Sequence, residues 1–311
     1  HALCTYDEGE HAGLVGFLAD VVRAEEIVGR GEAGAGEGEL WTALGDLGFG
    51  AGQGQALHRA TRVHDHFIVD FDSPYRDARL VESNFRPSFG EGVPFSPEQR
   101  ARVEARIVAA ADGLRALSPA AYGLSAAMIR TLMPRIDDRN PTFKGSSNRG
   151  MVGRVNLFNP QLDGINHAVI ASSLVHEAIH ILLYLFEQDA PLVVDERRAH
   201  ELRITSPWSG KRVHLLALVH ATFVWYGLLH LWRLAGVERY FPRREIDYYR
   251  GFCARGLRDG RLSAALAEHA ALVRPDVLDA LREMEATAPT DEVEVEVEVE
   301  VDDPRRSAGP R

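Results

Sequence analysis

A long apolar segment that carries two histidines four residues apart constrains this chain more than any other feature. It spans residues 173–183 and contains His176, Glu177 and His180 in the order His-Glu-Ala-Ile-His. No proline or glycine interrupts the segment, and its apolar residues predict a buried helix. Side chains four residues apart lie on one helix face, so both imidazoles can reach a single metal ion. The alternative is a pair of hydrogen-bonded core histidines.

The composition is that of an ordinary globular protein. Hydrophobic residues make up 45% of the 311 residues and charged residues 26%, enough for one large domain or two small ones. The two cysteines, Cys4 and Cys253, are far apart in sequence and offer neither a disulfide framework nor a thiolate zinc site. This cysteine usage is typical of a reducing compartment, and we predict a cytoplasmic location.

The net charge of −10 argues against two classes of partner. Residues 291–311 hold eight acidic residues and three arginines, so this tail carries −5 and the rest of the chain another −5. A chain without a basic stripe is a poor ligand for nucleic acid or for an anionic membrane surface. The apolar runs are expected to fall short of a membrane span, and the N-terminus lacks a signal-peptide pattern. We therefore predict no nucleic-acid partner and no membrane association.

The periodicity of apolar residues predicts an α+β fold that is predominantly helical. The clearest helix start is at Pro97, because Ser96 is a suitable N-cap and Glu98 places a negative charge in the first turn. Alternating apolar residues predict strands at residues 66–71 and 151–158. Further helices are expected over residues 10–30, 39–47, 97–117, 120–132, 212–234, 244–256 and 263–286.

Three parts follow from this pattern. Residues 1–145 are mainly helical and are a candidate for peptide binding, because they hold no chemical motif of their own. Residues 146–288 contain the His-Glu-Ala-Ile-His helix and form the predicted metal-binding catalytic core. Residues 289–311 include an alternating Glu-Val repeat, for which we expect a solvated, disordered tail because like charges on one face oppose strand pairing. An added edge strand, or a peptide mimic lying in a binding groove, is the alternative.

Two histidines do not complete a catalytic metal site, which usually takes a third protein ligand. His220 is the preferred candidate, because it is the polar residue at the middle of an apolar stripe on the helix expected over residues 212–234. A buried imidazole needs a partner, and a metal ion held by another buried helix is one; a backbone carbonyl is the alternative. Glu196 and Glu201 are weaker candidates, because they lie among arginines in a pattern typical of a solvated face.

These residues together resemble a known family. The His-Glu-Ala-Ile-His helix, the later Ser206-Pro207-Trp208, and Arg212 shortly before His220 are similar to the HExxH-motif proteins of peptide natural-product gene clusters. The resemblance covers about residues 149–234. It implies an iron(II)- and 2-oxoglutarate-dependent oxygenase that hydroxylates the β-carbon of a residue in a ribosomally made precursor peptide. It also implies that the iron is bound by His176, His180 and His220, with the metal's remaining positions left for 2-oxoglutarate and O2.

Such an enzyme must supply a cation for the far carboxylate of 2-oxoglutarate. A guanidinium suits this task because it forms two parallel hydrogen bonds with a carboxylate. Arg212 is the first candidate, since it is expected near the start of the His220 helix, and Arg154 on the preceding strand is the second. Arg149 and Lys144 are further candidates.

Two other functions fit the same motif. A zinc metallopeptidase would use Glu177 as the general base that activates a metal-bound water. A non-catalytic, metal-stabilised module for binding a leader peptide is the third hypothesis. The residue that separates the first two is Glu177, which is obligatory in the peptidase and has only a supporting role in the oxygenase.

Overall fold

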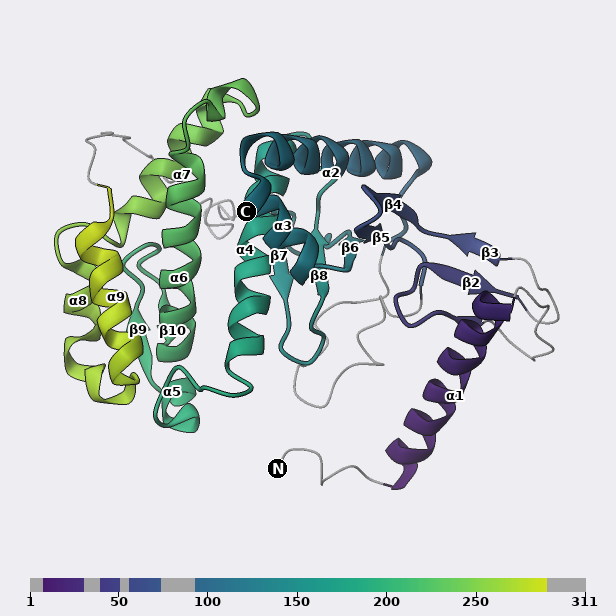
Figure 1. Cartoon of the computed structure of the whole chain (residues 1–311), viewed down its shortest axis with the longest axis horizontal. Coiled ribbons are helices and arrows are strands. Elements are labelled where there is room, and N and C mark those ends of the chain that lie inside the picture. The colour runs from purple at the N-terminus through teal and green to yellow at the C-terminus, as the bar shows by residue number, and fades with distance from the viewer. Residues whose placement is uncertain (1–7, 31–39, 51–55, 74–92, 290–311) are drawn as a thin grey trace, which may run out of the picture. The chain divides into compact units, whose positions relative to one another are not determined.

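The computed structural model describes residues 8–30, 40–50, 56–73 and 93–289 (Figure 1). The chain divides into two compact units, residues 1–194 and 195–311. Helices predominate and short strands accompany them, which confirms the predicted α+β, mainly helical fold. The Glu-Val tail, residues 292–301, lies outside the described residues, as does the rest of the chain from residue 290.

The first unit contains two small sheets and four helices within the described ranges. The helices are α1 (Glu8–Arg30), α2 (Pro97–Leu117), α3 (Pro119–Met128) and α4 (His167–Phe186). The strands are β1 (Leu40–Trp41), β2 (Leu47–Phe49), β3 (Ala56–Arg59), β4 (Thr61–Val63), β5 (Phe67–Val69), β6 (Thr131–Arg135), β7 (Lys144–Ser147) and β8 (Arg154–Phe158). One sheet has the order β1-β2-β3, and the other has the order β4-β5-β6-β8-β7.

The five-stranded sheet provides the platform for α4. Its central pairings, β5 with β6 and β6 with β8, are parallel, whereas β4 and β7 are antiparallel edge strands. Leu132, Val155 and Leu157 on the central strands are fully buried. Helix α4 packs against α2, α3 and the edge strand β7. The predicted division at residue 145 therefore falls inside this sheet, because strands from both sides of it pair there.

Local capping explains where the two main helices of this unit begin. Ser96 and Gln99 form a reciprocal capping box at the start of α2, which begins at Pro97 as predicted. The Asn166 side chain accepts hydrogen bonds from the backbone N–H groups of Ala168 and Val169 and so caps α4. The amide cap and the apolar sequence together give α4 a defined first turn.

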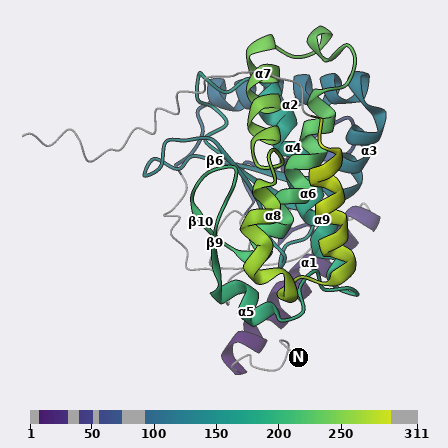
Figure 2. The same cartoon turned by 90° about the vertical axis from the view of Figure 1, so that its left-hand side faces the viewer.

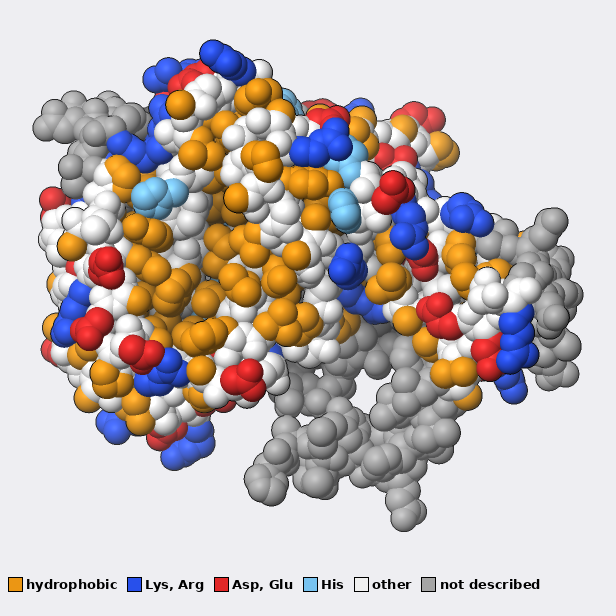
Figure 3. Space-filling model, viewed as in Figure 1, with side chains coloured by type: hydrophobic (Ala, Val, Ile, Leu, Met, Phe, Trp, Pro, Cys, Tyr) orange, Lys and Arg blue, Asp and Glu red, His pale blue; other side chains and the backbone are white. Residues whose placement is uncertain are grey.

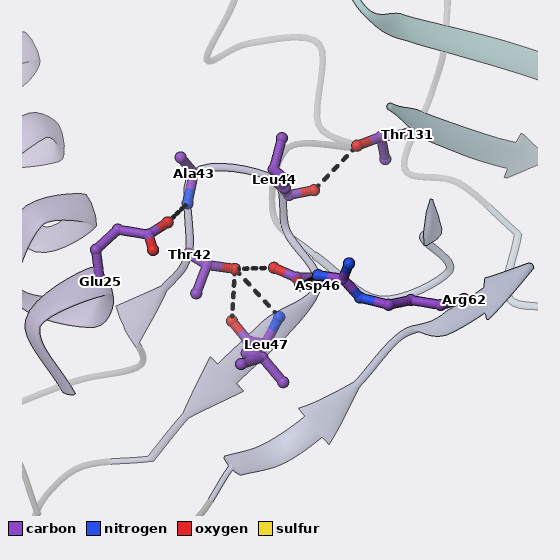
Figure 4. A network of polar contacts seen from close by, with 8 residues as sticks. All are labelled: Glu25, Thr42, Ala43, Leu44, Asp46, Leu47, Arg62 and Thr131. Atoms are coloured by element: carbon purple, nitrogen blue, oxygen red, sulfur yellow. Dashed lines mark hydrogen bonds and ion pairs between the residues drawn. The ribbon is translucent and has the colours of Figure 1, made fainter. Parts of the chain in front are cut away.

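A polar network fixes the turn between β1 and β2 (Figure 4). The Thr42 hydroxyl donates to Asp46 (2.6 Å), and Asp46 also pairs with Arg62 at the start of the next hairpin. The backbone of the same turn accepts a hydrogen bond from Thr131 on β6 and donates one to Glu25 on α1. These contacts connect the three-stranded sheet to α1 and to the central sheet.

The second unit is built around α6. Its described helices are α5 (Glu196–Glu201), α6 (Leu215–Trp232), α7 (Arg243–Arg255), α8 (Arg261–Leu266) and α9 (Pro275–Thr287), with the 3-10 helices η3 (Val237–Arg239) and η4 (Ala267–Leu272). Strands β9 (Arg203–Thr205) and β10 (Arg212–His214) form an antiparallel ribbon. Helix α6 packs against α7 and α9, and Trp232 at its end stacks on Tyr249 of α7.

Four expected helices differ from the structure, and one of them, over residues 212–234, begins only at Leu215 because residues 212–214 form β10. Of the helix expected over residues 39–47, the described residues 40–47 form β1, a turn and the start of β2, because Gly45 adopts a left-handed conformation and the buried Leu40 and Trp41 pair with β2. Residues 131–132 belong to β6, so α3 ends at Met128. The helix expected over residues 263–286 is divided into α8, η4 and α9, because Val273 is extended and Pro275 begins a new helix.

The apolar character of two helices exceeds the expectation from the sequence. By length and composition α4 and α6 could each cross a membrane, contrary to the expectation that the apolar runs fall short. In the most apolar window of each, 56% of the α4 residues and 61% of the α6 residues are buried inside the protein. Core helices of soluble proteins meet the same criterion, so these helices are weak support for membrane association.

Candidate metal centre

Helix α4 brings the two motif histidines together, as their spacing predicts. The Nε2 atoms of His176 and His180 are 3.2 Å apart, and the ring centroids are 4.8 Å apart. Both side chains are partly buried, with 23% of the His176 side chain exposed, so the pair can be reached from the surface.

This separation suits a shared metal ion. Two nitrogens that each bind one ion at about 2.1 Å lie roughly 3.0–3.4 Å apart in octahedral or tetrahedral geometry. The same separation fits an N–H···N hydrogen bond between the rings, which was the alternative from the sequence. Burial lowers the pKa of His176 to about 4, so its ring is neutral at physiological pH, which is the form that binds metals.

Glu177 lies beside the pair but is held by β7. Its side chain is 4% exposed, and its Oε1 is 4.0 Å from the His176 Nε2. The Ser147 hydroxyl donates to its Oε2 at 2.6 Å. Burial raises the pKa of Glu177 to about 7, against the opposing effects of the Ser147 hydrogen bonds and the charge of Lys144.

A glycine on β7 makes this contact possible. A Cβ atom at Gly145 would lie 2.1 Å from the Ser173 hydroxyl and 2.9 Å from the Glu177 Oε1, which is closer than real Cβ contacts. The absence of a side chain therefore lets the strand approach α4 closely. Within the described ranges the buried Ser173 hydroxyl has no hydrogen-bond partner.

Further groups of the same unit line up along α4. The Tyr184 ring stacks on the His180 ring with centroids 6.0 Å apart. Burial, followed by the nearby Glu177 charge, raises the pKa of the Tyr184 hydroxyl. Arg149, a candidate to bind 2-oxoglutarate, lies 3.6 Å from the buried Glu187 carboxylate and forms an ion pair with it. Ser147, Gly145 and Tyr184 were not found from the sequence, because small polar residues at a strand end and an aromatic ring in an apolar run are unremarkable in composition.

Figure 3 shows hydrophobic side chains gathered on the surface over α4. Leu182, Leu185 and Phe186, near the C-terminal end of this helix, are 43%, 42% and 48% exposed. The histidines are therefore followed on the same helix by an exposed apolar surface.

His220 belongs to the second unit, where α6 carries it as expected. It is 4% exposed, in agreement with the predicted burial of this polar residue. Among the described residues, no group of three or more His, Cys, Asp or Glu side chains is arranged to hold a metal ion. The role of His220 as the third ligand remains a prediction. Glu196 and Glu201 lie on α5, where Glu201 pairs with Arg197 on an exposed face, as expected.

The two arginines proposed for 2-oxoglutarate lie on strands. Arg212 is exposed on β10 and pairs in register with Thr205; it is not on the His220 helix, which begins at Leu215. That part of the prediction is wrong, because residues 212–214 extend to complete the ribbon before the helix begins. The Arg154 guanidinium donates to the backbone carbonyl of Ala43 at 2.7 Å, a structural contact with the turn between β1 and β2.

Comparisons with known proteins do not assign this centre to a family. No protein-family model matches the chain, and no curated protein sequence matches it.

Proposed function

We propose that this chain is an iron(II)- and 2-oxoglutarate-dependent oxygenase that hydroxylates a side chain of a ribosomally made peptide. The observation that carries the metal is the 3.2 Å separation of the His176 and His180 Nε2 atoms on one face of α4. The reaction class rests on the sequence resemblance. His220 is the proposed third ligand, also on the sequence argument.

Bound iron with 2-oxoglutarate and O2 would supply the oxidising power needed to attack an unactivated C–H bond. The chain's own residues hold and orient the ligands. Ser147 anchors the Glu177 carboxyl on the β7 side of α4, and Glu177 in turn lies beside the His176 ring. The apolar surface of α4 suits an apolar portion of a peptide substrate.

A zinc metallopeptidase is the second candidate, and Glu177 is the observation that favours it. A general base works best when its pKa is close to the working pH, and burial raises the pKa of Glu177 to about 7. Its Oε1 lies only 4.0 Å from a proposed metal ligand. In this reading Glu177 would take the proton from a metal-bound water.

The first experiment uses metal-free protein under anaerobic conditions. Addition of iron(II) and 2-oxoglutarate should produce a weak visible charge-transfer band that requires both additions. His176→Ala and His180→Ala should lose the band, whereas His200→Ala, which changes an exposed histidine on α5, should keep it. Absence of the band together with tight zinc binding would contradict the oxygenase proposal and favour the peptidase.

Glu177→Gln then separates the two chemistries. The peptidase predicts complete loss of peptide cleavage, because the general base is gone. The oxygenase predicts that the charge-transfer band survives, because Glu177 is not a proposed metal ligand. Arg212→Ala and Arg154→Ala test which arginine binds the far carboxylate of 2-oxoglutarate. The variant that needs a higher 2-oxoglutarate concentration to reach half of the full band intensity identifies that arginine.

A further inference from the structure

We infer that the Glu-Val tail of this chain, residues 292–301, docks as a third strand on the free edge of β9 in the second unit. This inference is independent of the proposed function. It rests on four features of the described residues: the open edge of the β9–β10 ribbon, the distribution of side chains on its two faces, the net positive charge of residues 195–289, and the position from which the tail leaves α9.

The ribbon has an edge that can accept a strand. Among the described residues β9 pairs only with β10, so the backbone groups on its other side face no partner strand. Edge strands of this kind are templates for strand addition. Figures 1 and 2 show the ribbon beside α6, against which both of its strands pack.

The two faces of the ribbon have opposite character. Arg203, Thr205, Arg212 and His214 share one face, because Arg212 is opposite Thr205 and His214 is opposite Arg203. Ile204 and Val213 share the other face, where Ile204 is 5% exposed. Helix α6 packs on the ribbon, and the burial of Ile204 places the apolar face toward the core.

The tail has the matching alternation. From Glu292 to Val301 every second residue is glutamate and the others are valine, so an extended tail presents carboxylates on one face and apolar side chains on the other. Paired with β9, the valines continue the apolar face of Ile204 and the glutamates lie beside Arg203. Valine favours strands, and opposite charges on neighbouring strands stabilise pairing where like charges oppose it.

The charge balance favours this partner. Residues 195–289 carry 15 Lys and Arg against 12 Asp and Glu, a net charge of +3, whereas residues 291–311 carry −5. Lys211 at the turn of the ribbon is exposed and makes no ion pair within the part of the chain that the structure describes. Arg203 contacts the His214 ring on β10 and the carbonyl of His200, so its charge lies on the polar face of the ribbon.

The tail also starts close to the ribbon. Trp208, in the turn between β9 and β10, donates to the Cys253 carbonyl and lies against Gly256. Leu257, the next residue, lines the same hollow as Ala286 near the end of α9. When extended, the five residues from Thr287 to Glu292 reach up to about 17 Å from the end of α9, in the direction of this set of contacts. Running on from the turn, the tail is antiparallel to β9.

Amide hydrogen exchange tests this inference on the full chain. Residues 203–206 should exchange at least tenfold more slowly in the full chain than in a chain ending at residue 289. Residues 292–301 of the full chain should exchange as slowly as its residues 203–206. The protection of both segments should weaken in 1 M salt. Circular dichroism is the check that the shortened chain folds. Equal exchange of residues 203–206 in the two chains would overturn the inference.

A pair of charge-matched variants provides the control. Glu294→Lys with Glu296→Lys should remove the protection of β9, whereas Asp302→Lys with Asp303→Lys, which changes the charge equally outside the repeat, should preserve it. Loss of protection in both variants would show that general charge attraction, and not strand pairing, holds the tail. That result would overturn the inference. Protection that appears only with rising protein concentration, together with a dimer mass, would show that the strand comes from a second copy and would also overturn it.

Discussion

Gly145 is the residue that sets the distance between β7 and α4. Its missing side chain leaves room for the Ser173 hydroxyl and the Glu177 carboxylate, which a Cβ atom would meet at 2.1 and 2.9 Å. Ser173 and Glu177 are one helical turn apart and therefore face the same strand. The close approach places Ser147 within hydrogen-bond distance of Glu177 and so fixes the group beside the histidine pair.

Gly145→Ala should lower the free energy of unfolding by about 1–3 kcal/mol, because strand and helix must move apart. The control is Gly123→Ala on α3, where a Cβ meets nothing within 4 Å and should raise stability by about 0.5–1 kcal/mol. Urea denaturation measures both. In Gly145→Ala combined with Ser173→Ala, part of the loss should be recovered; equal effects of the two glycine variants would contradict this account.

Glu177 should make the stability of the metal-free protein depend on pH. Burial raises its pKa from 4.5 to about 7, so the folded chain holds this proton more tightly than the unfolded chain does. Its contribution to stability is therefore full below pH 4.5 and is lost as the pH rises through 7. Glu177→Gln should be more stable than the wild type at pH 8, by up to about 3 kcal/mol, with no gain below pH 4.5.

Urea denaturation of the metal-free proteins between pH 4.5 and 8 measures this difference. Glutamine keeps an oxygen that can accept the Ser147 hydrogen bond, so the comparison isolates the charge. The depressed pKa of His176 affects both proteins alike and cancels. A gain of the same size at every pH would contradict the assigned cause.

At the scale of elements, capping signals located helix starts better than periodicity did. Ser96 and Pro97 marked the first residue of α2 correctly, because a cap satisfies backbone N–H groups locally. Periodicity predicts that Arg212 lies in the first turn of α6, because Val213, Leu215 and Leu216 are apolar, whereas residues 212–214 form β10. Pairing with β9, which is a contact between residues distant in sequence, decided the extended conformation.

Asn166→Ala should lower the free energy of unfolding by about 1 kcal/mol, because two backbone N–H groups at the start of α4 lose their acceptor. Asn166→Asp should retain most of the stability, since a carboxylate accepts the same hydrogen bonds and suits the positive end of the helix dipole. Thermal or urea denaturation compares the three proteins. Equal stability of all three would show that the cap contributes nothing to α4.

At the scale of the whole molecule, the two most apolar helices lie in different compact units. Helix α4 carries the histidine pair in the first unit and α6 carries His220 in the second. Each is the central helix of its unit, which explains why both pass a length-and-composition test for membrane spans while more than half buried. Most of the apolar residues of α4 and α6 are buried in the cores of their units.

Metal binding should stabilise the protein as a whole. A ligand that binds only the folded state adds about 2.7 kcal/mol to the free energy of unfolding when its free concentration is a hundred times its dissociation constant. Chelation should therefore lower the melting temperature of the metal-loaded wild type, and His180→Ala should show no metal-dependent shift. The matched variant His200→Ala should keep the shift. Calorimetry with iron(II) and with zinc measures it, and an unchanged shift in His180→Ala would contradict ligation by the pair.

Sequence alone determined the features that depend on near neighbours. The helical spacing of His176 and His180, the start of α2 and the mainly helical α+β class follow from contacts within a few residues, which the order of residues specifies. Tertiary structure decided the rest: the Gly145 approach, the Ser147 contact with Glu177, and the strand conformation of Arg212. These depend on strands and helices that are distant in the sequence, and packing between them has no local signature.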